Sequence, residues 1–75
     1  MDEGFYSYLS GLDNLRLVAE DVDASRERID EVVELAGLGG CEQERFSTYT
    51  PGMKRRLRRA AELLVGLPET SVHQG

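Results

Sequence analysis

The residues best suited to chemistry form a turn that runs directly into a basic helix, within residues 47–57. Thr50 is a favourable helix N-cap, and Pro51 fits the first helical position, where an N–H is not needed. A helix N-terminus presents unpaired N–H groups and positive dipole charge, and residues 54–56 (Lys-Arg-Arg) add full positive charges. The turn therefore predicts a contact with an anion such as phosphate, although a well-capped helix without a ligand would have the same sequence.

No other group of side chains forms a catalytic or metal-binding pattern. Cys41 is the only cysteine, and no histidine lies close to it in sequence, so we expect an ordinary loop thiol without a disulfide or metal. His73 lies in a tail without periodicity. No arrangement of Ser, His and Asp residues suggests a catalytic triad. The carboxylates of residues 27–34 lie on one face of a predicted helix, as is typical of a solvent-exposed face. The sequence therefore predicts no catalytic residues.

Charge is divided unevenly along the chain. Residues 1–47 carry 12 acidic and 4 basic side chains, whereas residues 48–75 carry 2 acidic and 5 basic ones, and all five basic residues fall within positions 54–59. The net charge of −5 argues against nucleic-acid binding, because affinity for phosphates grows with the number of cationic contacts. The basic cluster is thus expected to be solvated or to face nearby carboxylates.

The apolar periodicity predicts three helices and no strands, and so a small all-α, three-helix domain. The first helix follows Ser10-Gly11 and ends near residues 21–24, and the second is capped by Ser25 and stops at Gly37. The third runs from Pro51 to about residue 65. The apolar face of the first helix consists of Leu12, Leu15, Val18, Ala19 and Val22. That of the second consists of Ile29, Val32, Val33 and Ala36, and that of the third of Met53, Leu57, Ala60, Ala61 and Leu64.

The remaining segments are assigned from composition. Residues 39–49 form a polar connector that contains Arg45 and Phe46. Three of the five aromatic residues, Phe5, Tyr6 and Tyr8, lie in a non-helical segment before the first helix, and we expect them to pack on another surface rather than to form a ligand cage. Residues 1–69 are assigned to the domain and residues 70–75 to a flexible tail.

The length and apolar content limit the class of protein. A chain of 75 residues buries only about 60% of the surface of its unfolded form, so its stability is marginal without a partner. No apolar run approaches the roughly 20 residues of a membrane span, and the acidic N-terminus is unlike a signal peptide. We therefore expect a cytoplasmic protein that does not insert into the membrane.

Three consecutive blocks of this sequence resemble the ATPases of ATP-binding-cassette (ABC) transporters. GFYSYLSGLDNLR (residues 4–16) is similar to the segment that leads into the helical subdomain of these ATPases, and IDEVVELAGL (residues 29–38) is similar to the next helix. YTPGMKRRL (residues 49–57) resembles the ABC signature motif, commonly LSGGQ, and AAELL (residues 60–64) continues it. The blocks follow the family's order and spacing across about residues 3–69.

This resemblance implies a role in trans. In the family, two nucleotide-binding domains close head to tail, and the signature of one contacts the γ-phosphate of ATP, with its Mg²⁺, held by the other. Carried over, Thr50 supplies the hydroxyl, Gly52 a backbone N–H, and Met53 and Lys54 complete the nucleotide-binding turn. Phe5, Tyr6 and Tyr8 lie where the family contacts the transmembrane permease. No cofactor is expected on the chain alone.

The sequence also departs from the family. Pro51 removes one expected backbone donor, and Arg58 and Arg59 replace a small and an aliphatic residue. The 75 residues contain no G-x-x-x-x-G-K-[ST] phosphate loop. The family continues into an apolar strand that ends in Asp-Glu, and residues 69–75 do not have this pattern. We therefore expect no ATP hydrolysis by the chain alone. Two hypotheses remain: a truncated or excised signature-bearing subdomain that serves a partner ATPase and a permease, or a stand-alone helical interaction module, such as a homo-oligomer.

Overall fold

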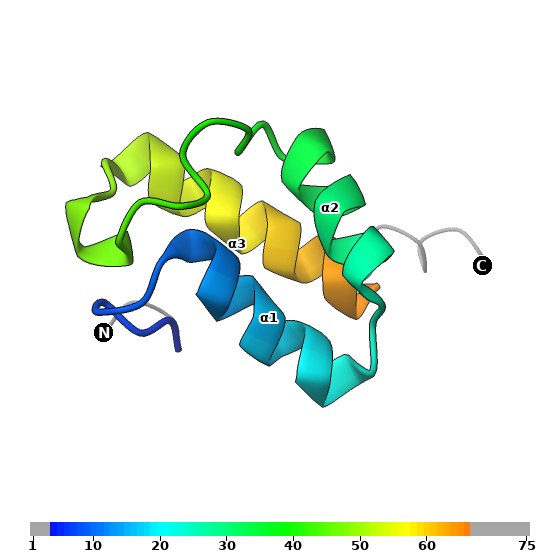
Figure 1. The fold of residues 1–75 in the computed structure, drawn as a ribbon. Coiled ribbons are helices and arrows are strands. Elements are labelled where there is room, and N and C mark those ends of the chain that lie inside the picture. The colour runs from blue at the N-terminus through cyan, green and yellow to red at the C-terminus, as the bar shows by residue number, and fades with distance from the viewer. Residues whose placement is uncertain (1–3, 67–75) are drawn as a thin grey trace.

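The computed structural model describes residues 4–66, which contain three α-helices and one short 3₁₀ helix (Figure 1). The α-helices are α1 (Gly11–Val22), α2 (Arg26–Leu35) and α3 (Pro51–Val65), and the 3₁₀ helix is η1 (Phe46–Thr48). The described part of the chain has no strand, and a single antiparallel bridge joins Ser10 to Arg45. The predicted all-α class is confirmed. Three positions discussed from the sequence lie outside the described residues, namely Pro68, His73 and the tail at residues 70–75.

Each α-helix begins at a side-chain cap, and the caps of α2 and α3 are those that the sequence predicts. The side-chain oxygens of Ser10, Ser25 and Thr50 accept hydrogen bonds from backbone N–H groups three residues later. Each bond satisfies an N–H that has no partner inside its helix. These local contacts fix the starts of the helices independently of the tertiary fold.

The helix ends use left-handed backbone conformations. Asp23 ends α1 with a φ of 58°, and Gly66 ends α3 with a φ of 75°. After α2, Gly37 has a φ of 75°, and the N–H of Leu38 returns to the carbonyl of Val33 at 2.9 Å. This is the glycine stop predicted for the second helix, and it places Leu38 in the core with no exposed surface.

Helix α3 is the centre of the domain. Helices α1 and α2 both pack on α3 and touch each other less, which leaves a groove between them (Figure 1). The guanidinium of Arg28 on α2 donates to the carbonyl of Leu63 at 3.2 Å and thereby joins α2 to the last turn of α3. The core consists of Leu15, Ala19, Ile29, Val32, Val33, Ala36, Leu38, Phe46, Tyr49, Leu57, Ala60 and Leu64.

The assignment of residues 39–49 to a polar connector is wrong for its aromatic residues. Phe46 begins η1 and Tyr49 directly follows it, and both are buried in the core. The connector also pairs with the segment before α1: the N–H of Phe46 donates to Leu9 at 2.8 Å, and that of Ser47 donates to Ser7 at 2.9 Å. The connector is thus part of the packed structure, because it covers the end of the core that the helices leave open.

The predicted apolar faces are correct except at their edges. Leu15 and Ala19 are buried, Leu12 and Val18 are half-buried, and Val22 is 37% exposed at the end of α1. Among residues 4–66 no helix is both long enough and apolar enough to cross a membrane.

Candidate functional site

The turn at Thr50 is exposed and carries a reciprocal cap. The Thr50 Oγ1 atom accepts the N–H of Met53 at 3.1 Å, and the Met53 Sδ atom accepts the N–H of Thr50 at 3.4 Å. Sulfur here takes the place of the Glu or Gln oxygen that usually closes such a capping box. The turn is therefore held in one shape before any ligand arrives.

Few donors remain at this helix start. Pro51 has no N–H, the N–H of Met53 is bound by Thr50 Oγ1, and the N–H of Lys54 donates to the carbonyl of Thr50 at 2.9 Å. Within the described residues, the N–H of Gly52 has no acceptor. Because the Thr50 oxygen acts as an acceptor, its proton stays available for donation. An approaching anion thus meets two donors, the Gly52 N–H and the Thr50 hydroxyl.

Gly52 is a glycine that this fold does not require. It has no positive φ, and a Cβ at this position would meet its nearest neighbours, Arg55 Nη2 and Thr50 Oγ1, at 3.8 and 3.9 Å, which are ordinary contacts. Glycine in a helix costs about 0.5–1 kcal/mol relative to alanine. Neither the backbone conformation nor a steric contact within the described residues therefore requires a glycine at position 52.

The cations of α3 are distributed around this turn. The Nζ atom of Lys54 lies 5.2 Å from the ring centroid of Phe46, and the Arg55 guanidinium lies near Gly52. The side chain of Lys54 is half-buried, whereas Arg55 and Arg59 are exposed. Lys54 thus lies over a ring of the core aromatic cluster, and Arg55 is the cation beside Gly52.

Tyr49 holds the turn on the rest of the molecule. Its hydroxyl donates to the carbonyl of Cys41 at 2.9 Å, and its ring lies 5.5 Å from that of Phe46. The hydroxyl also lies so close to Gly11 that no Cβ fits there. Burial, with smaller effects of Cys41, Glu42 and Glu44, raises the pKa of Tyr49 to about 12. Thr50 therefore follows a residue that is fixed to both α1 and the connector.

Cys41 is a half-buried thiol beside this anchor. Its pKa is raised above 9.0, chiefly by burial and then by the nearby carboxylate of Glu42. A raised pKa keeps a thiol protonated and less nucleophilic at neutral pH. Among residues 4–66 no group of His, Cys, Asp and Glu side chains is arranged to hold a metal ion.

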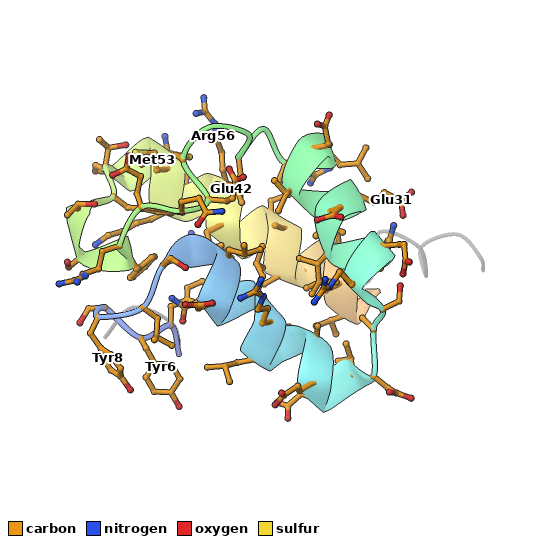
Figure 2. All side chains as sticks on the ribbon, viewed as in Figure 1. Tyr6, Tyr8, Glu31, Glu42, Met53 and Arg56 are labelled. Atoms are coloured by element: carbon orange, nitrogen blue, oxygen red, sulfur yellow. The ribbon has the colours of Figure 1, made fainter. Side chains whose placement is uncertain are left out.

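The three aromatic residues before α1 do not share one environment. Phe5 packs on Phe46 with 5.5 Å between ring centroids, as the sequence predicts. Tyr6 and Tyr8 are 48% and 66% exposed and contact each other, with 5.8 Å between ring centroids. The expected packing is found within the chain for Phe5, whereas Tyr6 and Tyr8 are exposed on the domain, and their contact with another surface stays a prediction. Figure 2 shows both tyrosines on one side of the domain, apart from Met53.

Asn14 positions this aromatic segment and was not identified from the sequence. It is 2% exposed, its Oδ1 atom accepts the N–H of Tyr6 at 2.7 Å, and its Nδ2 atom donates to the carbonyls of Tyr6 and Ser10, each at 3.0 Å. An asparagine inside an apolar helix face is the signal that was available, because a buried amide must be hydrogen-bonded. Its side chain ties residue 6 to α1.

Sequence comparisons find that the chain is similar to ABC transporter ATP-binding proteins. The chain is 45% identical over 60 residues to the uncharacterized ABC transporter ATP-binding protein YhcH of Bacillus subtilis (strain 168), and 41% identical over 61 residues to YdbJ of the same organism, also an uncharacterized ABC transporter ATP-binding protein. It is 37% identical over 62 residues to the bacitracin transport ATP-binding protein BcrA of Enterococcus faecalis. These matches support the ABC ATPase family.

The matches cover most of this chain and a small part of each relative. They include 79–81% of the chain, which spans 20% of the length of each of the three proteins. No family model matches the sequence. No solved structure matches it either. The similarity to ABC ATPases is therefore a similarity to one segment of them.

Proposed function

We propose that this chain is the signature-bearing helical part of an ABC-type ATPase, and that its Thr50 turn contacts the phosphate of ATP held by a partner nucleotide-binding domain. Thr50 donates its hydroxyl proton and Gly52 its N–H, while Met53 holds the turn and Lys54 contributes positive charge. ATP and Mg²⁺ are bound by the partner. The chain does not hydrolyse ATP by itself in this proposal.

The observation that carries the proposal is the state of the donors at the start of α3. Reciprocal capping by Thr50 and Met53 leaves two donors directed outward, beside a glycine that the fold does not need. A helix N-terminus with such donors favours a phosphate group. The 37–45% identity to ABC transporter ATP-binding proteins supplies independent support.

The second contact in the proposal is with a membrane permease. Tyr6 and Tyr8 are exposed aromatic residues on a segment that Asn14 holds against α1, and Phe5 anchors the same segment in the core. Exposed tyrosines on a rigid backbone are well suited to a protein interface. The chain then acts in the cytoplasm at the inner face of the membrane and transmits closure of the nucleotide site to the permease.

A complementation assay tests the nucleotide contact. The full chain is mixed with a complete nucleotide-binding domain of BcrA whose own signature has been disabled by substitution, and the rate of ATP hydrolysis is measured. We expect the chain to raise the rate and Thr50→Val to abolish the increase, because valine keeps the shape and removes the hydroxyl.

Thr50→Val also removes a helix cap, which costs about 1 kcal/mol, so a matched control is needed. Ser25→Ala removes the equivalent cap of α2, away from the turn, and should leave the stimulation unchanged. Circular dichroism checks that both variants are folded. Absence of binding and of any rate change with the wild-type chain would contradict the proposal.

The second candidate is a stand-alone helical interaction module. It is favoured by the large apolar side chains that residues 4–66 expose, with Leu35 at 62% and Val65 at 45% in addition to the two tyrosines. The ABC family usually has a small and an aliphatic residue where this chain has Arg58 and Arg59, which also favours a different role. Light scattering after size exclusion distinguishes the two functions: a well-folded oligomer that ignores nucleotide supports the module, and a monomer opposes it.

A further inference from the structure

The groove between α1 and α2 is separate from the turn at Thr50. It exists because each helix packs mainly on α3, and the Asp23–Ser25 loop closes one end. Its volume is about 600 Å³, and its apolar lining consists of Leu12, Ala19, Ala24 and Ile29.

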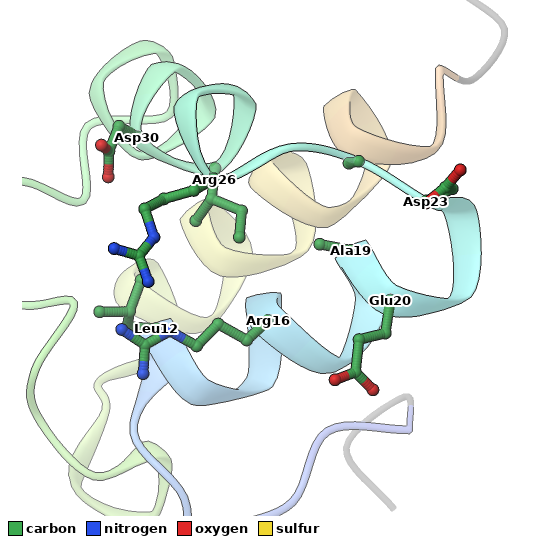
Figure 3. A pocket seen from close by; sticks show the side chains of 9 residues that line it. Leu12, Arg16, Ala19, Glu20, Asp23, Arg26 and Asp30 are labelled. Carbon is green, nitrogen blue, oxygen red and sulfur yellow. The ribbon is translucent and has the colours of Figure 1, made fainter.

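Charged side chains are sorted along this groove. Figure 3 shows the guanidinium groups of Arg16 and Arg26 directed toward the end where Leu12 lies, whereas Glu20 and Asp23 lie at the other end. Asp30 lies on the rim near Arg26. The groove thus has a basic end supplied by two helices and an acidic end supplied by the end of α1.

The two arginines are only partly compensated by the chain itself. Arg16 pairs with Asp13 at 3.0 Å, and both of these side chains are about half exposed. Within residues 4–66 Arg26 forms no salt bridge. A guanidinium can bind a carboxylate through two parallel N–H donors. A carboxylate entering at the basic end would meet Arg16 and Arg26 together and reduce the repulsion between them.

We infer that the groove binds an extended peptide segment of a partner protein, with an acidic side chain between Arg16 and Arg26 and a basic side chain beside Glu20 and Asp23. Arg16 and Asp23 are seven positions apart along α1, which corresponds to a rise of roughly 10 Å. An extended peptide spans this distance in about three residues. The peptide therefore carries its acidic and basic residues about three positions apart, with an apolar residue between them. This inference does not depend on the nucleotide contact.

Selection from a random peptide library tests the inference. The full chain is immobilised, displayed short peptides are selected on it, and an enriched peptide is synthesised for fluorescence anisotropy. We expect enriched peptides to share the acidic and basic spacing, and to bind Arg16→Gln or Arg26→Gln about tenfold more weakly, as loss of a charge-assisted contact predicts. Replacing the acidic residue of the peptide by its amide should weaken binding to the wild-type chain to the same extent.

Arg59→Gln is the matched control, because Arg59 is an exposed arginine on α3 outside the groove. It removes the same charge and should leave binding unchanged. The inference is overturned if no peptide is enriched over the double variant Arg16→Gln/Arg26→Gln. It is also overturned if the peptides bind all variants alike. The selection of peptides without an acidic residue, with inorganic phosphate bound in the groove, would overturn it as well.

Discussion

At the scale of single residues, the turn at Thr50 combines local stability with outward donors. Thr50 uses its oxygen for Met53 and keeps its proton, and Pro51 has no N–H to donate to an anion. Gly52 then presents its N–H without a side chain over it. Three neighbouring residue types thus produce a site whose donors are few and defined.

Substitution Gly52→Ala separates folding from function at this turn. We expect the free energy of unfolding to rise by up to about 1 kcal/mol, because alanine restricts the unfolded chain and meets no clash in the fold. The ATPase stimulation proposed above should fall, because the methyl group occupies the space above the N–H. Urea unfolding and the complementation assay measure the two effects. A loss of stability would show that the fold itself needs this glycine.

Tyr49 gives the protein a pH dependence in the alkaline range. Its pKa is about 12 in the folded state and about 10 when unperturbed, so the folded form retains the proton more strongly. Its contribution to stability is complete below pH 10 and is lost as the pH rises toward 12. Urea unfolding at several pH values should show this fall. Tyr49→Phe should show a smaller fall, and an equal slope in both proteins would assign the effect to other groups.

At the scale of elements, the caps decide where each helix begins and ends. Three side-chain oxygens start the helices, and left-handed residues at positions 23, 37 and 66 stop them. These devices act within a few residues, so their effect is independent of the partner elements. Arg28 adds a longer-range contact, since its charge lies at the C-terminal end of α3, where the helix dipole favours a cation.

Asp23 is the weakest of these stops, because it is the one non-glycine residue among positions 4–66 with a positive φ. We expect Asp23→Gly to raise the free energy of unfolding by about 0.5–1 kcal/mol, since glycine adopts this conformation without a Cβ penalty. Thermal unfolding measures the change. Asp21→Gly, inside the last turn of α1, is the control and should lower stability. Destabilisation by both changes would mean that the Asp23 side chain contributes more than its backbone conformation costs.

At the scale of the whole molecule, side chains outside the helices complete the core. Phe46 and Tyr49 come from the connector, Phe5 from the segment before α1, and Asn14 joins that segment to α1. The N-terminal N–H groups of α1 donate to connector carbonyls, from Gly11 to Glu44 at 3.1 Å and from Leu12 to Glu42 at 2.8 Å. The domain is thus held at this end by polar contacts around an aromatic cluster.

Loss of Asn14 should affect the whole domain. We expect Asn14→Ala to reduce the free energy of unfolding by about 2 kcal/mol, because the part-buried N–H of Tyr6 loses its acceptor and the carbonyls of Tyr6 and Ser10 each lose one of two donors. In a chain of 75 residues this is a large share of the total. Urea unfolding measures the loss, and hydrogen exchange should reveal opening at residues 5–9. Gln43→Ala removes an exposed amide and should have no such effect. Equal stability of both variants would show that water replaces the Asn14 contacts.

The sequence by itself determined the three helices, their caps and the exposed Thr50 turn, because these depend on residues within one or two helical turns of each other. It also carried the resemblance to ABC ATPases that the comparisons support. Only the tertiary structure decided that Phe46 and Tyr49 enter the core, that Tyr6 and Tyr8 stay exposed, and that Arg16 and Arg26 share a groove. Those outcomes depend on which surfaces α3 covers, and periodicity along the chain does not contain that information.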